Sequence, residues 1–204
     1  MQRILSVFFA ALLLALVPLA SVSANTYAPP LKGEMIRLKV ISNPSDTMPN
    51  ILFDLPDGKS KYLHDFKGSI VVLNMWATWC PPCVKELPSL NALQRSMDPS
   101  YVKVLAVSVD PKGETATSEF LTNHNLDQLE PFVDKNEVLM RLEQLRGAAG
   151  IPITMIIDPQ SRLLAVYNGD ADWNGADARA VIDYYRNKVS FVPFSFGSMG
   201  AFSQ

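Results

Sequence analysis

The chain has 204 residues, of which 48% are hydrophobic and 19% charged, and its 18 Lys and Arg against 20 Asp and Glu give a formal net charge of −2. This composition is too apolar for a disordered protein, and two cysteines are too few for a disulfide-stapled scaffold. No basic run is longer than two residues, so nucleic-acid binding is not expected. Two cysteines and two histidines also leave very few side chains for thiol or metal chemistry.

The first 24 residues have the pattern of a targeting segment. Arg3 is their single charge, an apolar run covers residues 4–20, and Val22-Ser23-Ala24 is suited to cleavage by a signal peptidase. We expect a signal peptide over residues 1–24, with a retained membrane anchor as the alternative because the 17-residue run is at the lower limit of a membrane span. Either way, the rest of the chain is expected in the periplasm or a similar extracytoplasmic space, where thiols tend to be oxidised.

After this segment the sequence predicts a leader over residues 25–47, one domain over 48–188 and an uncharged, phenylalanine-containing tail over 189–204. Residues 51–66 predict a hairpin around an Asp-Gly turn. Apolar runs predict strands at 70–76, 102–109, 131–133, 153–157 and 163–167. Helices are expected from about residue 81 to 97 and at 114–125, 136–145 and 175–188. Strands that alternate with helices indicate an α/β layer architecture.

Cys80 and Cys83 lie where a predicted buried strand passes into a helix. Residues three apart across a first helical turn have Cα atoms about 5–6 Å apart, within reach of a disulfide. With Cys80 at the N-cap, its sulfur is expected to be exposed at the positive end of the helix, while Cys83 is shielded one turn inside. One thiol that attacks and a sheltered one that resolves the mixed disulfide are what disulfide exchange requires.

Two prolines between the cysteines limit the expected acidity of Cys80. Pro82 has no N–H to donate to the sulfur, so the Cys83 amide is the main remaining donor. A helix N-terminus stabilises an anion by about 0.3–1 kcal/mol, and by about 2 kcal/mol when partly buried. We therefore expect a modestly lowered pKa for Cys80 and a mildly reducing pair.

Two further residues are candidates for the same site. Glu86 follows Cys83 by three residues and shares its helix face, where a partly buried carboxylate can exchange a proton with that thiol. The alternative for Glu86 is a solvated side chain paired with Lys85 or Arg95. Pro152 opens a predicted strand, a position that suits a residue without a backbone N–H.

The segment VVLNMWATWCPPCVKELPSL, residues 71–90, closely resembles the active-site segment of TlpA-like (TlpA/ResA-type) extracytoplasmic thiol-disulfide oxidoreductases of the thioredoxin superfamily. The resemblance covers residues 48–188. It implies a thioredoxin-like α/β fold, with a central mixed β-sheet flanked by helices and an N-terminal β-hairpin extension. It also implies that Glu86 acts near the thiols and that Pro88 kinks the helix. Asn74 stands where ordinary thioredoxins carry a buried Asp.

The resemblance further implies that Pro152 is cis and faces the cysteines, with Ile151 presenting its backbone to a substrate peptide. The expected catalytic residues are Cys80, Cys83 and Glu86. The residues expected to bind the substrate are Trp79, Pro81, Pro82, Ile151 and Pro152. No metal and no cofactor are expected, because the redox group is the Cys80–Cys83 disulfide itself.

The expected function is reduction of protein disulfides by dithiol–disulfide exchange outside the cytoplasm. By resemblance, a membrane electron-relay protein would supply the electrons, and the targets would belong to cytochrome c maturation or to assembly of the copper centre of cytochrome oxidase. A DsbA-like oxidant remains an alternative, since it uses the same chemistry in the opposite direction.

A copper(I) chaperone is a second alternative, because two thiolates can hold that ion. Sco-type copper proteins, however, carry a wider cysteine spacing and a ligand histidine, and no histidine lies near Pro152 in the sequence. Zinc would need two more ligands, and His64 and His124 lack the spacing of a zinc finger. Both histidines are expected to be exposed and without a role.

Overall fold

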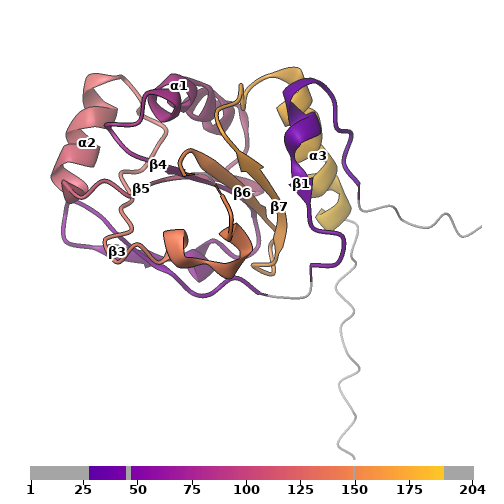
Figure 1. Ribbon diagram of the computed structural model, residues 1–204, viewed down its shortest axis with the longest axis horizontal. Coiled ribbons are helices and arrows are strands. Elements are labelled where there is room, and N and C mark those ends of the chain that lie inside the picture. Colours follow the sequence, from indigo (N-terminus) through magenta and orange to yellow (C-terminus); the bar gives the residue numbers. More distant parts are fainter. Residues whose placement is uncertain (1–27, 45–46, 149, 191–204) are drawn as a thin grey trace, which may run out of the picture.

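The computed structural model describes residues 28–44, 47–148 and 150–190. A five-stranded sheet has the order β1-β7-β6-β4-β5, and β2 and β3 form a separate two-stranded ribbon (Figure 1). The strands are β1 (Lys39–Val40), β2 (Leu52–Asp54), β3 (Ser60–Tyr62), β4 (Ile70–Trp76), β5 (Val102–Ser108), β6 (Ile153–Ile157) and β7 (Leu163–Asn168). The α-helices are α1 (Pro81–Ser96), α2 (Gly113–Asn123) and α3 (Ala176–Ser190). The predicted signal segment and the tail from residue 191 lie outside the described residues.

Strand β4 lies inside the sheet, and all seven of its residues are buried. It pairs in parallel with β5 and antiparallel with β6, and the antiparallel pairing continues through β7 to β1. The sheet is therefore mixed, and the predicted thioredoxin-like α/β fold class is confirmed. Because β4 and β5 run in parallel, their carboxyl ends meet at one edge of the sheet, where α1 begins.

Alternate residues of β4 face two hydrophobic cores, one on each side of the sheet. Val72 and Trp76 belong to the core that contains the disulfide and the inner faces of α1 and α3. Leu73 and Met75 belong to the opposite core, which packs against the β2-β3 ribbon. In Figure 1, α2 lies at the β5 end of the sheet and α3 at the β1 end.

Two predicted strands are shorter in the structure than the sequence indicates. The hairpin forms around the Asp-Gly turn, but β3 ends at Tyr62, and residues 63–66 form a 3-10 helix that buries Leu63 and Phe66. In the segment predicted as a strand at 131–133, Val133 makes only isolated bridges, to Asp54 and Ser108.

The helix predicted over residues 136–145 is wrong. Two 3-10 turns, Leu139–Arg141 and Glu143–Leu145, replace it. Glu137 has φ +52°, a left-handed conformation that an α-helix does not contain. A three-residue spacing of buried side chains fits the three residues per turn of a 3-10 helix. The side chains with this spacing that enter the second core are Leu139, Leu142 and Leu145.

The leader contains structure that its sequence does not indicate. Gly33–Arg37 is a 3-10 helix, and Lys39–Val40 is β1, the edge strand that pairs with β7. Met35 and Leu38 are buried in the same core as the inner face of α3. Among the described residues, no helix combines the length and the apolar character needed to cross a membrane.

Candidate active site

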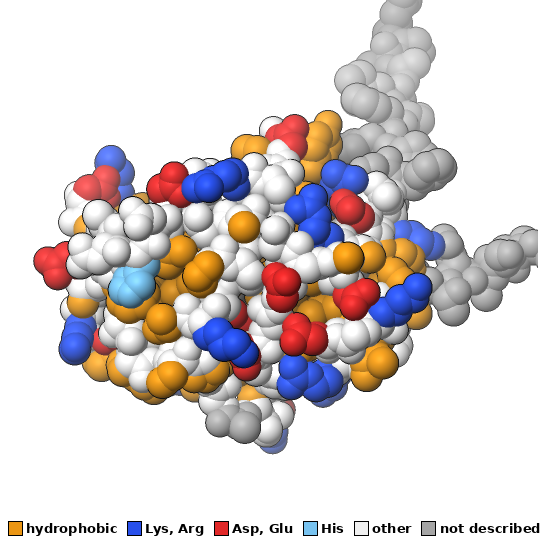
Figure 2. Space-filling model, turned by 90° about the horizontal axis from the view of Figure 1, so that it is seen from above, with side chains coloured by type: hydrophobic (Ala, Val, Ile, Leu, Met, Phe, Trp, Pro, Cys, Tyr) orange, Lys and Arg blue, Asp and Glu red, His pale blue; other side chains and the backbone are white. Residues whose placement is uncertain are grey.

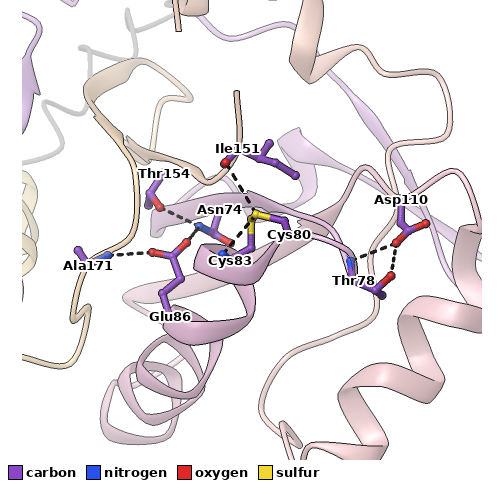
Figure 3. The surroundings of a disulfide bond; sticks show 9 residues. All are labelled: Asn74, Thr78, Cys80, Cys83, Glu86, Asp110, Ile151, Thr154 and Ala171. Carbon is purple, nitrogen blue, oxygen red and sulfur yellow. Dashed lines mark hydrogen bonds between the residues drawn. A yellow bond between two sulfur atoms is a disulfide. The ribbon is translucent and has the colours of Figure 1, made fainter. Parts of the chain in front are cut away.

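Cys80 caps the N-terminus of α1. Its extended backbone (φ −101°, ψ 100°) precedes Pro81, and its Sγ accepts a hydrogen bond of 3.3 Å from the Cys83 amide. Pro82 has no N–H to offer, so the Cys83 amide is the donor that the sequence predicts. The two cysteines form a disulfide with a Cα–Cα distance of 5.3 Å (Figure 3).

The disulfide is less accessible than the sequence suggests. Cys83 is fully buried, and Cys80 is only 4% exposed, so the expectation of an exposed Cys80 sulfur is wrong. The reason is the loop before β6, because the Ile151 carbonyl oxygen lies 3.8 Å from Cys80 Sγ. Cys80 nevertheless keeps the remaining opening to solvent, beside Trp79, whose side chain is 59% exposed.

The Ile151–Pro152 peptide bond is cis and lies next to the disulfide. Pro152 is buried, and its carbonyl accepts a hydrogen bond from Gly169, which connects the loop before β6 to the end of β7. Pro81 and Pro82 are exposed on the first turn of α1. The residues predicted to bind a substrate therefore lie on two segments, 79–82 and 151–152, of which the second contacts the sulfur of the first.

Glu86 is buried one turn after Cys83, with 2% of its surface exposed. Its Oε2 accepts hydrogen bonds from the Ala171 amide (3.1 Å) and from Trp173 Nε1 (2.9 Å). Its Oε1 accepts one of 2.7 Å from Asn74 Nδ2. Burial raises the pKa of Glu86 to about 7, although these three hydrogen bonds act in the opposite direction. A carboxyl group of this kind can bind or release a proton near neutral pH.

The alternative of a solvated, salt-bridged Glu86 does not hold. Lys85 pairs with Asp170, and Arg95 pairs with Asp127 on the surface. Neither cation faces Glu86, so neither supports its ionised form directly. The carboxyl group depends on hydrogen-bond donors alone.

Asn74 connects Glu86 to the sheet. Its Nδ2 donates to Glu86 Oε1 and, at 2.9 Å, to Thr154 Oγ1, while its Oδ1 has no hydrogen-bond partner in the described part of the chain. An amide carries both donors and an acceptor. In the orientation present, Asn74 donates to an ionised Glu86; turned over, its Oδ1 would accept a hydrogen bond from a protonated Glu86. An ionised Asp at this position would lack the donor.

Sequence reasoning missed two groups that position the site. Asp110 is buried just after β5, and it accepts hydrogen bonds from the Thr78 amide (3.1 Å) and the Thr78 hydroxyl, which fixes the loop before Cys80. The loop Gly169–Trp173 supplies two of the three donors to Glu86. The sequence places Asp110 directly after a buried strand that neighbours β4, and this position was the available signal.

Metal ligands do not converge on this site. Within residues 28–44, 47–148 and 150–190, no group of three or more His, Cys, Asp or Glu side chains could hold a metal ion. His64 is half-buried, with its Nε2 3.0 Å from the Met48 carbonyl oxygen, so the expectation of an exposed side chain is wrong for His64. His124 is exposed, as expected, and stacks on Phe120. Figure 2 shows acidic and basic side chains interspersed on the face that it displays, without a large patch of one sign.

A thioredoxin-like fold with a Cys-Pro-Pro-Cys disulfide at the start of a helix defines a thiol-disulfide oxidoreductase. Residues 44–182 match the AhpC/TSA family, and the chain belongs to this family. It is 30% identical over 122 residues to the thiol-disulfide oxidoreductase ResA of Bacillus thuringiensis subsp. konkukian, covering 60% of this chain and 68% of the relative. ResA of Bacillus subtilis is also 30% identical, over 129 residues (63% and 69%). The predicted enzyme class and TlpA/ResA-type relationship are confirmed.

Solved structures agree on the fold. A putative thiol:disulfide interchange protein DsbE from Chlorobium tepidum superposes with a TM-score of 0.55 at 25% identity, covering 70% of this chain and 98% of that one. A secreted thiol-disulfide isomerase from Corynebacterium glutamicum superposes with a TM-score of 0.60 at 23% identity, covering 76% and 92%.

Proposed function

We propose that this enzyme works outside the cytoplasm as a reductant of protein disulfides, with Cys80, Cys83 and Glu86 as its catalytic residues. The observation that carries the proposal is the position of a buried carboxyl group one turn from the sheltered cysteine of a redox pair, where burial raises the pKa of that carboxyl group to about 7. This arrangement gives Cys83, which has no access to solvent, a nearby group that can take its proton.

In the reduced enzyme, the Cys80 thiolate attacks one sulfur of the substrate disulfide. A Cys80–substrate disulfide forms, and the other substrate sulfur leaves as a thiolate that takes up a proton from water. Cys83 then transfers its proton to Glu86 and attacks Cys80 Sγ. The Cys80–Cys83 disulfide forms again, and the second substrate sulfur leaves as a thiolate and is protonated in turn. Two electrons have passed from the enzyme dithiol to the substrate.

Substrate recognition falls to Trp79, Pro81, Pro82, Ile151 and Pro152. The exposed indole of Trp79 offers an apolar surface beside the entrance to Cys80. An extended peptide laid along Ile151 would bring its sulfur toward Cys80, because the Ile151 carbonyl already lies 3.8 Å from Cys80 Sγ. Backbone recognition of this kind accepts many sequences.

The enzyme would be exported by residues 1–24, as a cleaved signal peptide or a retained anchor. A membrane protein carrying a dithiol would return it to the reduced state, because thiols in an oxidising compartment tend to become disulfides and each turnover consumes the enzyme's dithiol. Its substrates would be disulfides in apocytochrome c or in copper-carrying assembly factors of cytochrome oxidase. The redox-active disulfide would be its only redox group, without a cofactor.

The reduction potential of the Cys80–Cys83 pair tests the direction of electron flow. We expect a value near or below about −200 mV when the protein is equilibrated with a thiol buffer, toward the thioredoxin end of the range. A value near about −120 mV would overturn the proposal and make the protein an oxidant of the DsbA type.

Trapping identifies the substrate class. A Cys83→Ser variant retains the attacking thiol but cannot resolve the mixed disulfide, so it should accumulate a covalent complex with its target. We expect a peptide with an oxidised Cys-x-x-Cys-His segment, the haem-attachment pattern, to be trapped faster than a peptide with the same composition and a scrambled cysteine spacing. Equal rates for the two peptides would argue against apocytochrome c as a substrate.

A further inference from the structure

We call residues 28–41 of the leader the leader strap. Two of its residues, Glu34 and Arg37, contact the loop Gly169–Trp173, which hydrogen-bonds Glu86. We propose that Glu34 and Arg37 of the leader strap are positioning residues for disulfide exchange, which hold this loop in the place from which it hydrogen-bonds Glu86. The inference rests on the proposed role of Glu86 as the group that exchanges a proton with Cys83.

Glu34 and Arg37 contact the loop from its outer side. Glu34 Oε2 accepts a hydrogen bond of 3.0 Å from the Asp172 amide. Arg37 Nη2 lies 3.4 Å from the Asp170 carbonyl oxygen, and the same nitrogen donates to the Tyr167 hydroxyl. Both strap residues thus bind groups within or just before the loop.

The inner side of the same loop contacts α1. The Ala171 amide and Trp173 Nε1 donate to Glu86, and the Trp173 amide donates to Ser89 Oγ at 3.0 Å. Asp170 forms an ion pair of 2.7 Å with Lys85. Between Asp170 and Trp173, loop residues that face the strap alternate with residues that face Glu86, so a displacement on one side moves the donors on the other.

Aromatic contacts also connect Arg37 to the Trp173 donor of Glu86. The Arg37 guanidinium lies 4.9 Å from the centre of the Tyr167 ring, and Tyr167 meets Trp173 edge to face with ring centres 5.5 Å apart. Trp173 is fully buried and donates to Glu86 through its indole nitrogen. Arg37 therefore supports both the backbone and the side-chain donor of the loop.

The leader strap can act as a support because it is anchored on both sides of these residues. Met35 and Leu38 are buried in the core beneath α3, and Gly33 lies against Asp177 near the start of that helix. After Arg37, β1 pairs with β7, and the Ile41 amide donates to the Leu164 carbonyl at 2.8 Å. Glu34 and Arg37 are thus held over the loop by packing against α3 and by strand pairing with β7.

Loosening the loop is expected to change the titration of Glu86. Loss of the Ala171 and Trp173 donors would by itself raise the pKa of Glu86. Burial is the largest cause of the raised pKa, so the water admitted by a loosened loop should outweigh that loss and lower the pKa from about 7 toward its ordinary value.

Two charged groups lie near Glu86: Asp170, which raises its pKa, and Lys85, which forms an ion pair with Asp170. The other groups that face it are Cys83 on the same helix and the neutral side chains of Asn74 and Thr154 on the sheet. Substitutions in the leader strap leave these residues in place, but the charge of Arg37 lowers the pKa of Asp170 and the charge of Glu34 raises that of Lys85. A control that removes charge without removing the hydrogen bond is therefore needed.

The test is the carboxyl titration of Glu86, followed by carbon NMR in protein with labelled glutamate side chains and assigned with Glu86→Gln. The oxidised protein is used, because disulfide-bonded cysteines do not titrate. We expect Glu34→Ala and Arg37→Ala each to lower the pKa by about one unit, a tenfold loss of proton affinity. Hydrogen exchange of the Ala171 amide should accelerate by about tenfold in the same variants.

Two controls separate loop positioning from other effects. Lys39→Ala removes a positive charge from an exposed position of the same leader strap and should leave the Glu86 pKa unchanged. Glu34→Gln keeps an acceptor for the Asp172 amide and should behave as the parent protein does. If Glu34→Ala and Arg37→Ala change neither the pKa nor the Ala171 exchange, the positioning role is refuted, even where their melting temperatures fall.

The outcomes also distinguish this inference from the proposed function. If the strap variants lower the pKa of Glu86 but the pH profile of disulfide exchange stays where it was, the positioning role stands and the catalytic role of Glu86 fails. If Glu86→Gln slows exchange while the strap variants leave the pKa in place, the positioning role fails and the catalytic role stands.

Discussion

At the residue scale, the Glu86 carboxyl group couples the stability of the fold to pH. It binds a proton more tightly in the folded than in the unfolded chain, because burial raises its pKa from 4.5 to about 7. The stabilisation from this proton is present below pH 4.5 and is lost as the pH rises through about 7. An ionised carboxylate with three donors and no cation beside it is the form needed to take a proton from Cys83.

A Glu86→Gln variant should remove this pH dependence. The substituted side chain is neutral at every pH, and the free Asn74 Oδ1 can turn to accept its amide hydrogen. The variant should be close to the parent at pH 4.5 and more stable by about 3 kcal/mol at pH 8, on the conversion of about 1.4 kcal/mol per pKa unit. Denaturant unfolding at both pH values measures the difference. The matched control is Glu119→Gln, on the exposed side of α2, which should show no difference in unfolding free energy that depends on pH. If Glu86→Gln differs from the parent by the same free energy at both pH values, the raised pKa of Glu86 is contradicted.

Asn74 can be tested by giving it a charge. In an Asn74→Asp variant, a second carboxylate would lie at the position from which Nδ2 donates to Glu86 at 2.7 Å. Like charges this close share one proton, so the first ionisation of the pair stays accessible and the second is raised well above 7. The pH profile of disulfide exchange should shift upward by about one unit or more. The control is Thr154→Val, which removes a neutral acceptor of the Asn74 amide and should leave the pH profile nearly unchanged. If the pH profile of Asn74→Asp is also unchanged, Asn74 has no part in the proton transfer of Glu86.

At the element scale, the segment between α2 and β6 shows how backbone conformation at two residues, Glu137 and Leu142, decides between two kinds of helix. Both an α-helix and a pair of 3-10 turns can bury leucines three residues apart, so the apolar pattern of residues 139–145 fits either. The left-handed conformation of Glu137 prevents an α-helix from running through residue 137, and the extended Leu142 ends the first 3-10 turn. The Asp134 carboxylate accepts a hydrogen bond from the Leu139 amide. The buried Asp134 thus caps the first turn.

A Glu137→Gly substitution distinguishes the two structures. Glycine adopts a left-handed conformation without strain, so the variant should unfold no more easily than the parent and can gain up to about 1 kcal/mol. Inside an α-helix, the same change would cost about 1 kcal/mol. Glu143→Gly is the matched control, because it removes the same exposed charge from a right-handed turn and should destabilise. Destabilisation by both changes would favour the helix that the sequence predicts.

The sequence predicts the elements that hold the cysteines better than the elements that surround them. Strands β4 and β5 and helix α1 follow from apolar runs and from a cap-and-proline pattern, all local signals. The donors from Ala171 and Trp173 lie 85 and 87 residues from Glu86, and one of them is a backbone amide. Neither can be inferred from local pattern. The packing of the leader cannot be predicted from its sequence either, because it contributes only scattered apolar residues, such as Met35 and Leu38, to the core.

At the scale of the whole molecule, we expect the leader strap to belong to the cooperative folding unit, which would then be larger than the segment that resembles the family. The predicted domain begins at residue 48, yet β1 is an edge strand of the five-stranded sheet, and Met35 and Leu38 are buried in the core beneath α3. A segment packed in this way should unfold together with the rest of the core. It also places the support of the active-site loop close in sequence to the predicted export segment.

The buried methionine of the leader strap tests this boundary. Met35 is 1% exposed in the core beneath α3, so Met35→Ala should lower the free energy of unfolding by about 2–4 kcal/mol. Ile36 is its matched control, because it is 68% exposed and Ile36→Ala should change the stability by no more than about 0.5 kcal/mol. Equal, small effects in denaturant unfolding would mean that the strap is a dispensable attachment to a domain starting at residue 48. A large and selective loss in Met35→Ala, with a single cooperative transition, would place the strap within the folding unit that carries the redox site.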